Sequence, residues 1–126
     1  MGDEQPKATI LVVDDTPENI DVLNGILKPD YKIKVALNGE KALKVATSDK
    51  KPDLILLDIM MPGMDGFEVC RRLKGDADTS HIPVIFVSGA EDAASKDEGL
   101  KLGAVDYIVK PIDPNIVKDK IAQHLI

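Results

Sequence analysis

Several features that would assign a protein to a special class are missing from this sequence of 126 residues. Its only cysteine is Cys70, so no disulfide can form within the chain, and this cysteine usage fits a reducing compartment. The first residues, MGDEQPK, contain no apolar signal core, and no apolar run approaches the roughly 20 residues that span a membrane. We therefore expect a soluble, cytoplasmic protein.

Two classes of ligand are disfavoured by the charge and by missing motifs. The formal net charge is −6 at pH 7, which argues against binding to nucleic acid or to an anionic membrane surface. Neither a GxxxxGK(S/T) loop nor a GxGxxG loop occurs, so the chain has no glycine-rich cradle for the phosphates of a nucleotide. We expect no bound nucleotide and no direct nucleic-acid partner.

What the sequence does contain is a regular alternation of two patterns. Five apolar runs, TILVVD, KIKVAL, DLILLD, PVIFVS and VDYIVK, occupy residues 9–14, 32–37, 53–58, 83–88 and 105–110. Helical segments fall between and after them, near 17–28, 39–49, 65–75, 91–102 and 113–125. This alternation predicts an α/β domain with a parallel sheet and helices on both faces. It leaves no room for a second domain, so we expect a single domain over residues 1–126 with a core of about 8–125.

Residues that commonly cap helices precede four of the five helical segments. The candidates are Thr16, Asn38, Asp65 and Asp113. A proline follows Thr16 and Asp113 directly, and Glu68 stands at the capping-box spacing from Asp65. The fourth segment is different, because it contains Gly99 and only scattered apolar residues, namely Ala93, Ala94, Leu100 and Leu102. Few apolar anchors indicate low local stability.

The composition of the strands indicates their order. KIKVAL alternates lysine with apolar residues, which is typical of an edge strand, and VDYIVK is interrupted by Asp106 and Lys110. The other three runs are almost wholly apolar and are expected in the centre. With right-handed crossovers the simplest order is 2-1-3-4-5. Ligands then bind outside the carboxyl ends of the strands, where the topology switches between strands 1 and 3.

Polar residues stand at those carboxyl ends. They are Asp14 and Asp15 after the first strand, Asp58 after the third, Ser88 after the fourth and Lys110 after the fifth. Each has an ordinary structural explanation alone, as a cap, a turn residue or a lysine that reaches water. Because the carboxyl ends of parallel strands share one edge of the sheet, the five together predict a functional site.

The charges of this set indicate a metal and a reaction. Three carboxylates face one ammonium, and a hard divalent cation would relieve their repulsion. Mg²⁺ suits one or two carboxylates with waters and a phosphate, whereas Ca²⁺ would call for an EF-hand loop that is missing. His81, His124 and Cys70 stand apart from the set, so a metal with nitrogen or sulfur ligands is not expected. An aspartate beside a cation and a lysine can accept a phosphoryl group.

Four segments then resemble a known family. VVDDTPEN, LLDIMMPGMDGFE, VSGA and YIVKP are together similar to the receiver domain of bacterial two-component response regulators, and the resemblance covers nearly the whole chain. It implies a flavodoxin-like (βα)5 fold and a signalling domain that catalyses only its own phosphorylation and dephosphorylation. The phosphoryl group would come from a sensor histidine kinase, a phosphotransfer protein or a small acyl phosphate.

The resemblance assigns a role to each residue of the site. Asp58 would be the phosphoacceptor and a ligand of Mg²⁺. Asp15 would bind the ion directly, Asp14 through water, and Met60 through its backbone carbonyl. The loop residues Pro62 and Gly66 would let that carbonyl reach the ion.

A second group of residues would bind the phosphoryl group and transmit the signal. Ser88 matches the switch hydroxyl of the family, Lys110 its lysine, and Tyr107 the aromatic residue that swings inward when Ser88 moves. The bond between Lys110 and Pro111 is often cis in the family, which would aim the lysine into the pocket. Phosphorylation would then change the face made by helix 4, strand 5 and helix 5, which controls a partner or an output domain. A dimer that depends on phosphorylation is also compatible with this scheme.

Two other interpretations use the same residues. A phosphatase of the haloacid-dehalogenase type also forms an aspartyl phosphate, but its Asp-x-Asp-x-Thr spacing differs from the Asp14-Asp15-Thr16 found here. A pseudo-receiver would keep the fold as a binding module without phosphorylation, and the complete set of site residues argues against it.

Overall fold

The computed structural model describes residues 7–89 and 95–125. Its centre is a parallel sheet of five strands, β1 (Thr9–Val13), β2 (Lys32–Ala36), β3 (Leu54–Asp58), β4 (Val84–Ser88) and β5 (Asp106–Val109). The strands are ordered β2-β1-β3-β4-β5, and every neighbouring pair is parallel. The predicted α/β class and strand order are therefore confirmed.

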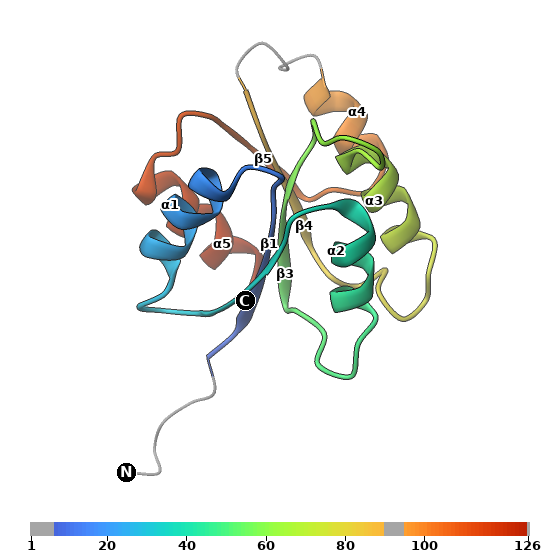
Figure 1. The fold of residues 1–126 in the computed structure, drawn as a ribbon, viewed down its shortest axis with the longest axis horizontal. Coiled ribbons are helices and arrows are strands. Elements are labelled where there is room, and N and C mark those ends of the chain that lie inside the picture. The colour runs from blue at the N-terminus through green and yellow to red at the C-terminus, as the bar shows by residue number, and fades with distance from the viewer. Residues whose placement is uncertain (1–6, 90–94, 126) are drawn as a thin grey trace.

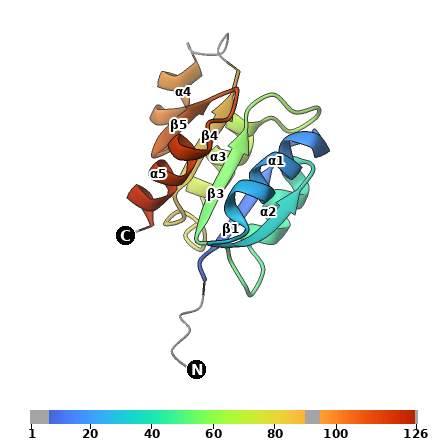
Figure 2. The same ribbon diagram turned by 90° about the vertical axis from the view of Figure 1, so that its left-hand side faces the viewer.

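Five helices cover the sheet, α1 (Pro17–Leu27), α2 (Gly39–Ala46), α3 (Gly66–Lys74), α4 (Ser95–Lys101) and α5 (Pro114–His124). Figure 1 shows the sheet nearly edge-on, with α1 and α5 on one side and α2, α3 and α4 on the other. In the perpendicular view α1 and α5 lie in front of the strands (Figure 2). The predicted helix near 91–102 is shorter in the structure, and its first part, with Ala93 and Ala94, lies outside the described residues.

The apolar runs are continuous because both faces of the sheet are covered. Alternate residues of β3 join different cores: Leu54 and Leu56 pack in the cluster under α1 and α5, while Ile55 and Leu57 pack in the cluster under α2 and α3. The predicted edge strand β2 differs, because Lys32 and Val35 are exposed along it. Packing on both faces therefore holds the central strands in position, and it also positions the residues that follow their carboxyl ends.

Three of the four predicted caps form. The side chains of Asn38, Asp65 and Asp113 accept hydrogen bonds from backbone N–H groups of α2, α3 and α5 at 2.8–3.0 Å. Thr16 occupies the position before α1, but its side chain makes no capping bond within the described residues. The prediction for Thr16 was wrong in this respect, because its contribution is a backbone N–H that donates to Asp14.

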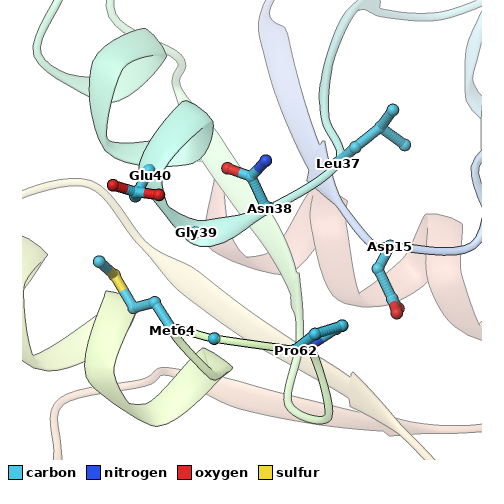
Figure 3. A pocket seen from close by; sticks show the side chains of 8 residues that line it. Asp15, Leu37, Asn38, Gly39, Glu40, Pro62 and Met64 are labelled. Carbon is cyan, nitrogen blue, oxygen red and sulfur yellow. The ribbon is translucent and has the colours of Figure 1, made fainter.

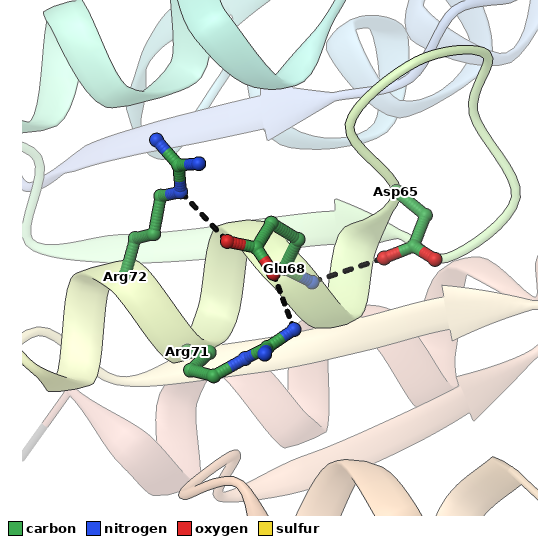
Figure 4. A network of polar contacts seen from close by, with 4 residues as sticks. All are labelled: Asp65, Glu68, Arg71 and Arg72. Carbon is green, nitrogen blue, oxygen red and sulfur yellow. Dashed lines mark hydrogen bonds and ion pairs between the residues drawn. The ribbon is translucent and has the colours of Figure 1, made fainter.

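The capping box at α3 forms only in one direction. Asp65 accepts from the backbone of Glu68, but the Glu68 carboxylate does not return the contact. It pairs instead with Arg71 and with Arg72 on the same helix surface (Figure 4). Two guanidinium groups attract this carboxylate more strongly than a single backbone N–H does.

Within the described ranges, none of the helices is long and apolar enough to cross a membrane.

Candidate functional site

The predicted site residues meet at the carboxyl edge of the sheet. β1 and β3 are neighbours with Val13 opposite Leu57, so Asp14 and Asp58, the next residue of each chain segment, lie side by side. Ser88 ends β4 next to β3, and Lys110 follows β5. Parallel pairing thus brings together residues separated by up to 96 positions in the sequence.

Three carboxylates form a compact acidic cluster. Oxygen atoms of Asp14, Asp15 and Asp58 all lie within 4.8 Å of one another. Asp14 and Asp58 are only 2% and 5% exposed, whereas Asp15 is exposed to solvent. An open carboxylate above two buried ones gives a cation oxygen ligands together with access from water.

Lys110 is shared between the two buried carboxylates. Its Nζ lies 3.5 Å from Oδ2 of Asp14 and 3.6 Å from Oδ1 of Asp58. Both distances are longer than the ~2.8 Å typical of a charge-assisted hydrogen bond, so the hydrogen bond to Asp14 and the ion pair with Asp58 are both long contacts. The backbone holds the residue in place, since its N–H donates to the carbonyl of Ser88 at 2.7 Å. The Lys110–Pro111 peptide bond is cis, as the resemblance led us to expect.

Burial and crowding change the acidity of Asp58. Its desolvation raises the pKa from the usual 3.8 to about 6, and the neighbouring charges of Asp14 and Asp15 act in the same direction. Lys110 lowers the pKa but does not offset the other effects. Without a further cation, the charged form of the Asp58 carboxyl group is therefore disfavoured in the folded protein.

Asp14 is held by a residue that the sequence analysis did not find. Its Oδ1 accepts from the backbone N–H of Thr16 at 2.9 Å, and its Oδ2 accepts from Nδ2 of Asn19 at 3.2 Å. Asn19 lies in the first turn of α1, whose start is marked by Pro17. That proline was the available signal, because it fixes which residues of the first turn lie beside the strand end.

The loop after β3 folds back onto the strand end. Met60 stands on the rim and is 67% exposed, and Gly63 takes a positive φ of 76°. The N–H of Gly66 donates to the carbonyl of Ile59 at 2.8 Å. A Cβ on Gly66 would lie 2.3 Å from the carbonyl oxygen of Asp58, so the turn requires glycine there.

Two hollows adjoin Asp15, and they differ in chemistry. The larger, of about 430 Å³, is lined by Asp15, Leu37, Asn38, Gly39, Glu40, Pro62, Gly63 and Met64 (Figure 3). No basic side chain lines it in the described part of the chain. The smaller, of about 350 Å³, is lined by Asp15, Thr16, Asp58, Met60, Ser88, Gly89 and Lys110. Only the smaller hollow combines carboxylates, a hydroxyl and an ammonium, which are the groups that phosphoryl chemistry requires.

Ser88 and Tyr107 are both buried on neighbouring strands. Tyr107 lies opposite Phe86, two residues before Ser88 on the same face of β4. Ser88 lines the smaller hollow, and it is two residues along β4 from Phe86, the residue that pairs with Tyr107. Ala90, two residues after Ser88, lies outside the described residues.

Histidine and cysteine take no part in the hollow. Cys70 is buried with its thiol 3.8 Å from the carbonyl of Leu102. His124 contacts Asp106 at 3.0 Å, and His81 is exposed. The carboxylates of Asp14, Asp15 and Asp58 are therefore the candidate metal ligands of the site.

A parallel (βα)5 sheet with an acidic cluster and a lysine at its carboxyl edge defines a class of phosphoryl-handling domain, and comparison with known proteins identifies the family. Residues 10–122 match the model of the response regulator receiver domain. The chain belongs to this family, whose members act as phosphoacceptors in two-component signalling.

Similarity to individual relatives supports this family assignment. The chain is 48% identical over 107 residues to the response regulator PleD of Caulobacter vibrioides, which covers 84% of this chain but only 23% of PleD. It is 42% identical over 107 residues to the protein PilH of Pseudomonas aeruginosa, covering 84% of this chain and 88% of PilH. A response regulator structure from Chloroflexus aurantiacus superimposes with a TM-score of 0.90 at 30% identity, over 96% of this chain and 98% of the other. The chain thus spans about a quarter of PleD and nearly all of PilH.

Proposed function

We propose that Asp58 is the residue that accepts the phosphoryl group. The observation that carries this proposal is its position: a buried carboxylate at the end of the most apolar strand, 3.6 Å from the Lys110 ammonium and open to a hollow of about 350 Å³. In the transfer, a carboxylate oxygen of Asp58 forms a bond to phosphorus. The bond from phosphorus to the donor's nitrogen or oxygen breaks, and its electron pair leaves with the donor.

Mg²⁺ is the cofactor that the donor set fits best. Carboxylates of Asp14, Asp15 and Asp58 within 4.8 Å of one another, together with the backbone carbonyl of Met60, would hold it. All of these are hard oxygen ligands, and burial together with the charges of Asp14 and Asp15 raises the pKa of Asp58, so a cation here would offset an unfavourable charge. When bound, the ion would neutralise charge on the phosphoryl oxygens and on the attacking carboxylate.

The remaining site residues would bind the phosphoryl group and pass on its presence. Lys110 can turn from the carboxylates to a phosphoryl oxygen, and the hydroxyl of Ser88 can donate to another. Tyr107 would follow Ser88 and bias the face of α4, β5 and α5 between two states. A sensor histidine kinase or phosphotransfer protein would supply the phosphoryl group, and an output domain or partner protein would bind this face.

Intact mass spectrometry tests the acceptor directly. The protein is incubated with acetyl phosphate and Mg²⁺, and with EDTA in place of the ion. We expect a gain of one phosphoryl group that requires Mg²⁺, disappears in Asp58→Asn and persists in the control Asp49→Asn, which changes an exposed aspartate. An unchanged gain in Asp58→Asn would refute the assignment.

The same sample separates the two alternative functions. Absence of any mass gain with several donors would favour a pseudo-receiver that only binds partners. Steady release of phosphate from a phosphomonoester would favour a phosphatase. We expect a stoichiometric mass gain and no such turnover.

Hydrogen exchange tests the output face. With Mg²⁺ and beryllium fluoride, a phosphoryl mimic, we expect altered exchange in the described parts of α4, β5 and α5. Changes confined to residues 58–66 would show that the signal does not reach this face.

A further inference from the structure

Oxygen Oδ2 of Asp14 accepts from two donors of different kinds. The neutral amide of Asn19 lies 3.2 Å away, and the charged Nζ of Lys110 lies 3.5 Å away. Oδ1 has its own partner, the N–H of Thr16 at 2.9 Å. Asp14 is 2% exposed, so these groups, rather than bulk water, orient its carboxylate.

The backbone places Asn19 for this contact. Pro17 begins α1, and the N–H groups of Asn19 and Ile20 both donate to the carbonyl of Thr16. Ile20 is buried in the core beneath α1, so the first turn is anchored to the sheet. The Asn19 amide is thereby fixed beside the end of β1 independently of Lys110.

The two donors cannot behave alike during the reaction. Lys110 is shared between Asp14 and Asp58, and in the proposed function it turns toward the phosphoryl group on Asp58. A cation bound at the carboxylates would also repel its ammonium. In either event Oδ2 of Asp14 loses one donor, and an unsatisfied buried acceptor is costly.

We propose that Asn19 is a positioning residue that keeps Asp14 oriented for the metal when Lys110 leaves it. This inference rests on the proposed function and adds a residue to it. A neutral amide is suited to the task, because it donates to the carboxylate without adding a positive charge that would compete with the ion. A second lysine at this position would hold Asp14 but would oppose metal binding.

A double-mutant cycle on Mg²⁺ affinity tests the inference. The ion is titrated by isothermal calorimetry into the wild-type protein, Asn19→Ala, Lys110→Ala and the double variant. With Lys110 present, Asn19→Ala is expected to weaken binding about 3- to 10-fold, as for the net loss of one typical hydrogen bond. In the Lys110→Ala background we expect a change of less than about twofold, because Asp14 then lacks a donor equally before and after the ion binds.

Asn24→Ala is the matched control. Asn24 is half-buried on the same helix, and among the described residues its side chain makes no hydrogen bond. Its substitution should leave Mg²⁺ affinity unchanged. Alanine favours helix at both positions, so thermal melting should show both variants folded, and Asn19→Gln, which keeps an amide donor on a longer stem, should recover part of the affinity.

Each outcome has one meaning. Equal weakening in both backgrounds would make Asn19 a general support of α1 and overturn the inference, as would no weakening in either. The expected cycle without a mass gain from acetyl phosphate would leave Asn19 as a support of the metal site while refuting the proposed acceptor function.

Discussion

The ammonium of Lys110 stands 3.6 Å from Oδ1 of Asp58, near enough to lower the carboxyl pKa but too far for a direct hydrogen bond. The same ammonium stands 3.5 Å from Asp14. A lysine held between two acids stabilises the crowded pocket while remaining available to a third anionic group.

Stability without metal should fall as the pH rises. The pKa of Asp58 is raised to about 6 in the folded protein from 3.8, so between these values the folded state holds a proton that the unfolded chain has lost. Raising the pH from about 4 to 7 in EDTA should therefore reduce the free energy of unfolding by about 1–3 kcal/mol. Urea unfolding across this range measures it.

Asp58→Asn and Mg²⁺ serve as the controls for this prediction. The variant removes the titrating group and should abolish that part of the pH dependence, while the ion should restore stability at pH 7. A pH dependence that survives in Asp58→Asn would assign it to other groups.

Lys110→Ala should increase the electrostatic repulsion among the carboxylates of the pocket in the absence of metal. Its charge lowers the pKa of Asp58, so its removal should raise that pKa further and reduce the free energy of unfolding at pH 7 by about 1–3 kcal/mol. Carboxyl NMR titration and urea unfolding report the two effects. Lys118→Ala, which removes an exposed ammonium from α5, should do neither, and a similar effect of both variants would contradict the role of Lys110.

A side chain at position 99 should push α4 away from the sheet. A Cβ on Gly99 would lie 2.6 Å from the ring of Phe86, which itself packs edge-on against Phe67 at 5.4 Å. Gly99→Ala should lower the free energy of unfolding by about 1–3 kcal/mol, the usual cost of overpacking a core. Thermal or urea unfolding measures it.

Gly25→Ala is the matched control for Gly99→Ala. Gly25 lies inside α1, and no described atom outside its own helix turn lies within 4 Å of the added Cβ. Alanine there should stabilise the protein by about 0.5–1 kcal/mol. If Gly99→Ala stabilises to the same extent, the close approach of α4 to Phe86 does not constrain the fold.

The sequence predicted the strands well and the helix ends less well. The run PVIFVS corresponds to β4 over Val84–Ser88, because a strand covered on both faces must be apolar throughout and its pattern is unmistakable. The helix predicted near 39–49 ends at Ala46 in the structure, since no apolar contact or cap in the sequence fixed its end.

Side-chain contacts between elements that are distant in the sequence could not be predicted from the sequence alone. Asn19 was missed because an asparagine in a first helical turn has no pattern of its own, and only the placement of α1 beside β1 brings it to Asp14. The sequence predicts Thr16 as a helix cap, whereas in the structure its backbone N–H donates to the Asp14 carboxylate. Residue type identified the charged groups of the site, but the neutral donors became visible only in three dimensions.

A crystal structure of the protein grown with Mg²⁺ and beryllium fluoride tests the central claim most directly. The account predicts an ion among Asp14, Asp15 and Asp58, a beryllium fluoride group on the Asp58 carboxylate, and Lys110 turned from Asp14 to a fluorine atom. An acidic cluster left without an ion, or a fluoride group bound elsewhere while Lys110 stays between the two acids, would contradict it.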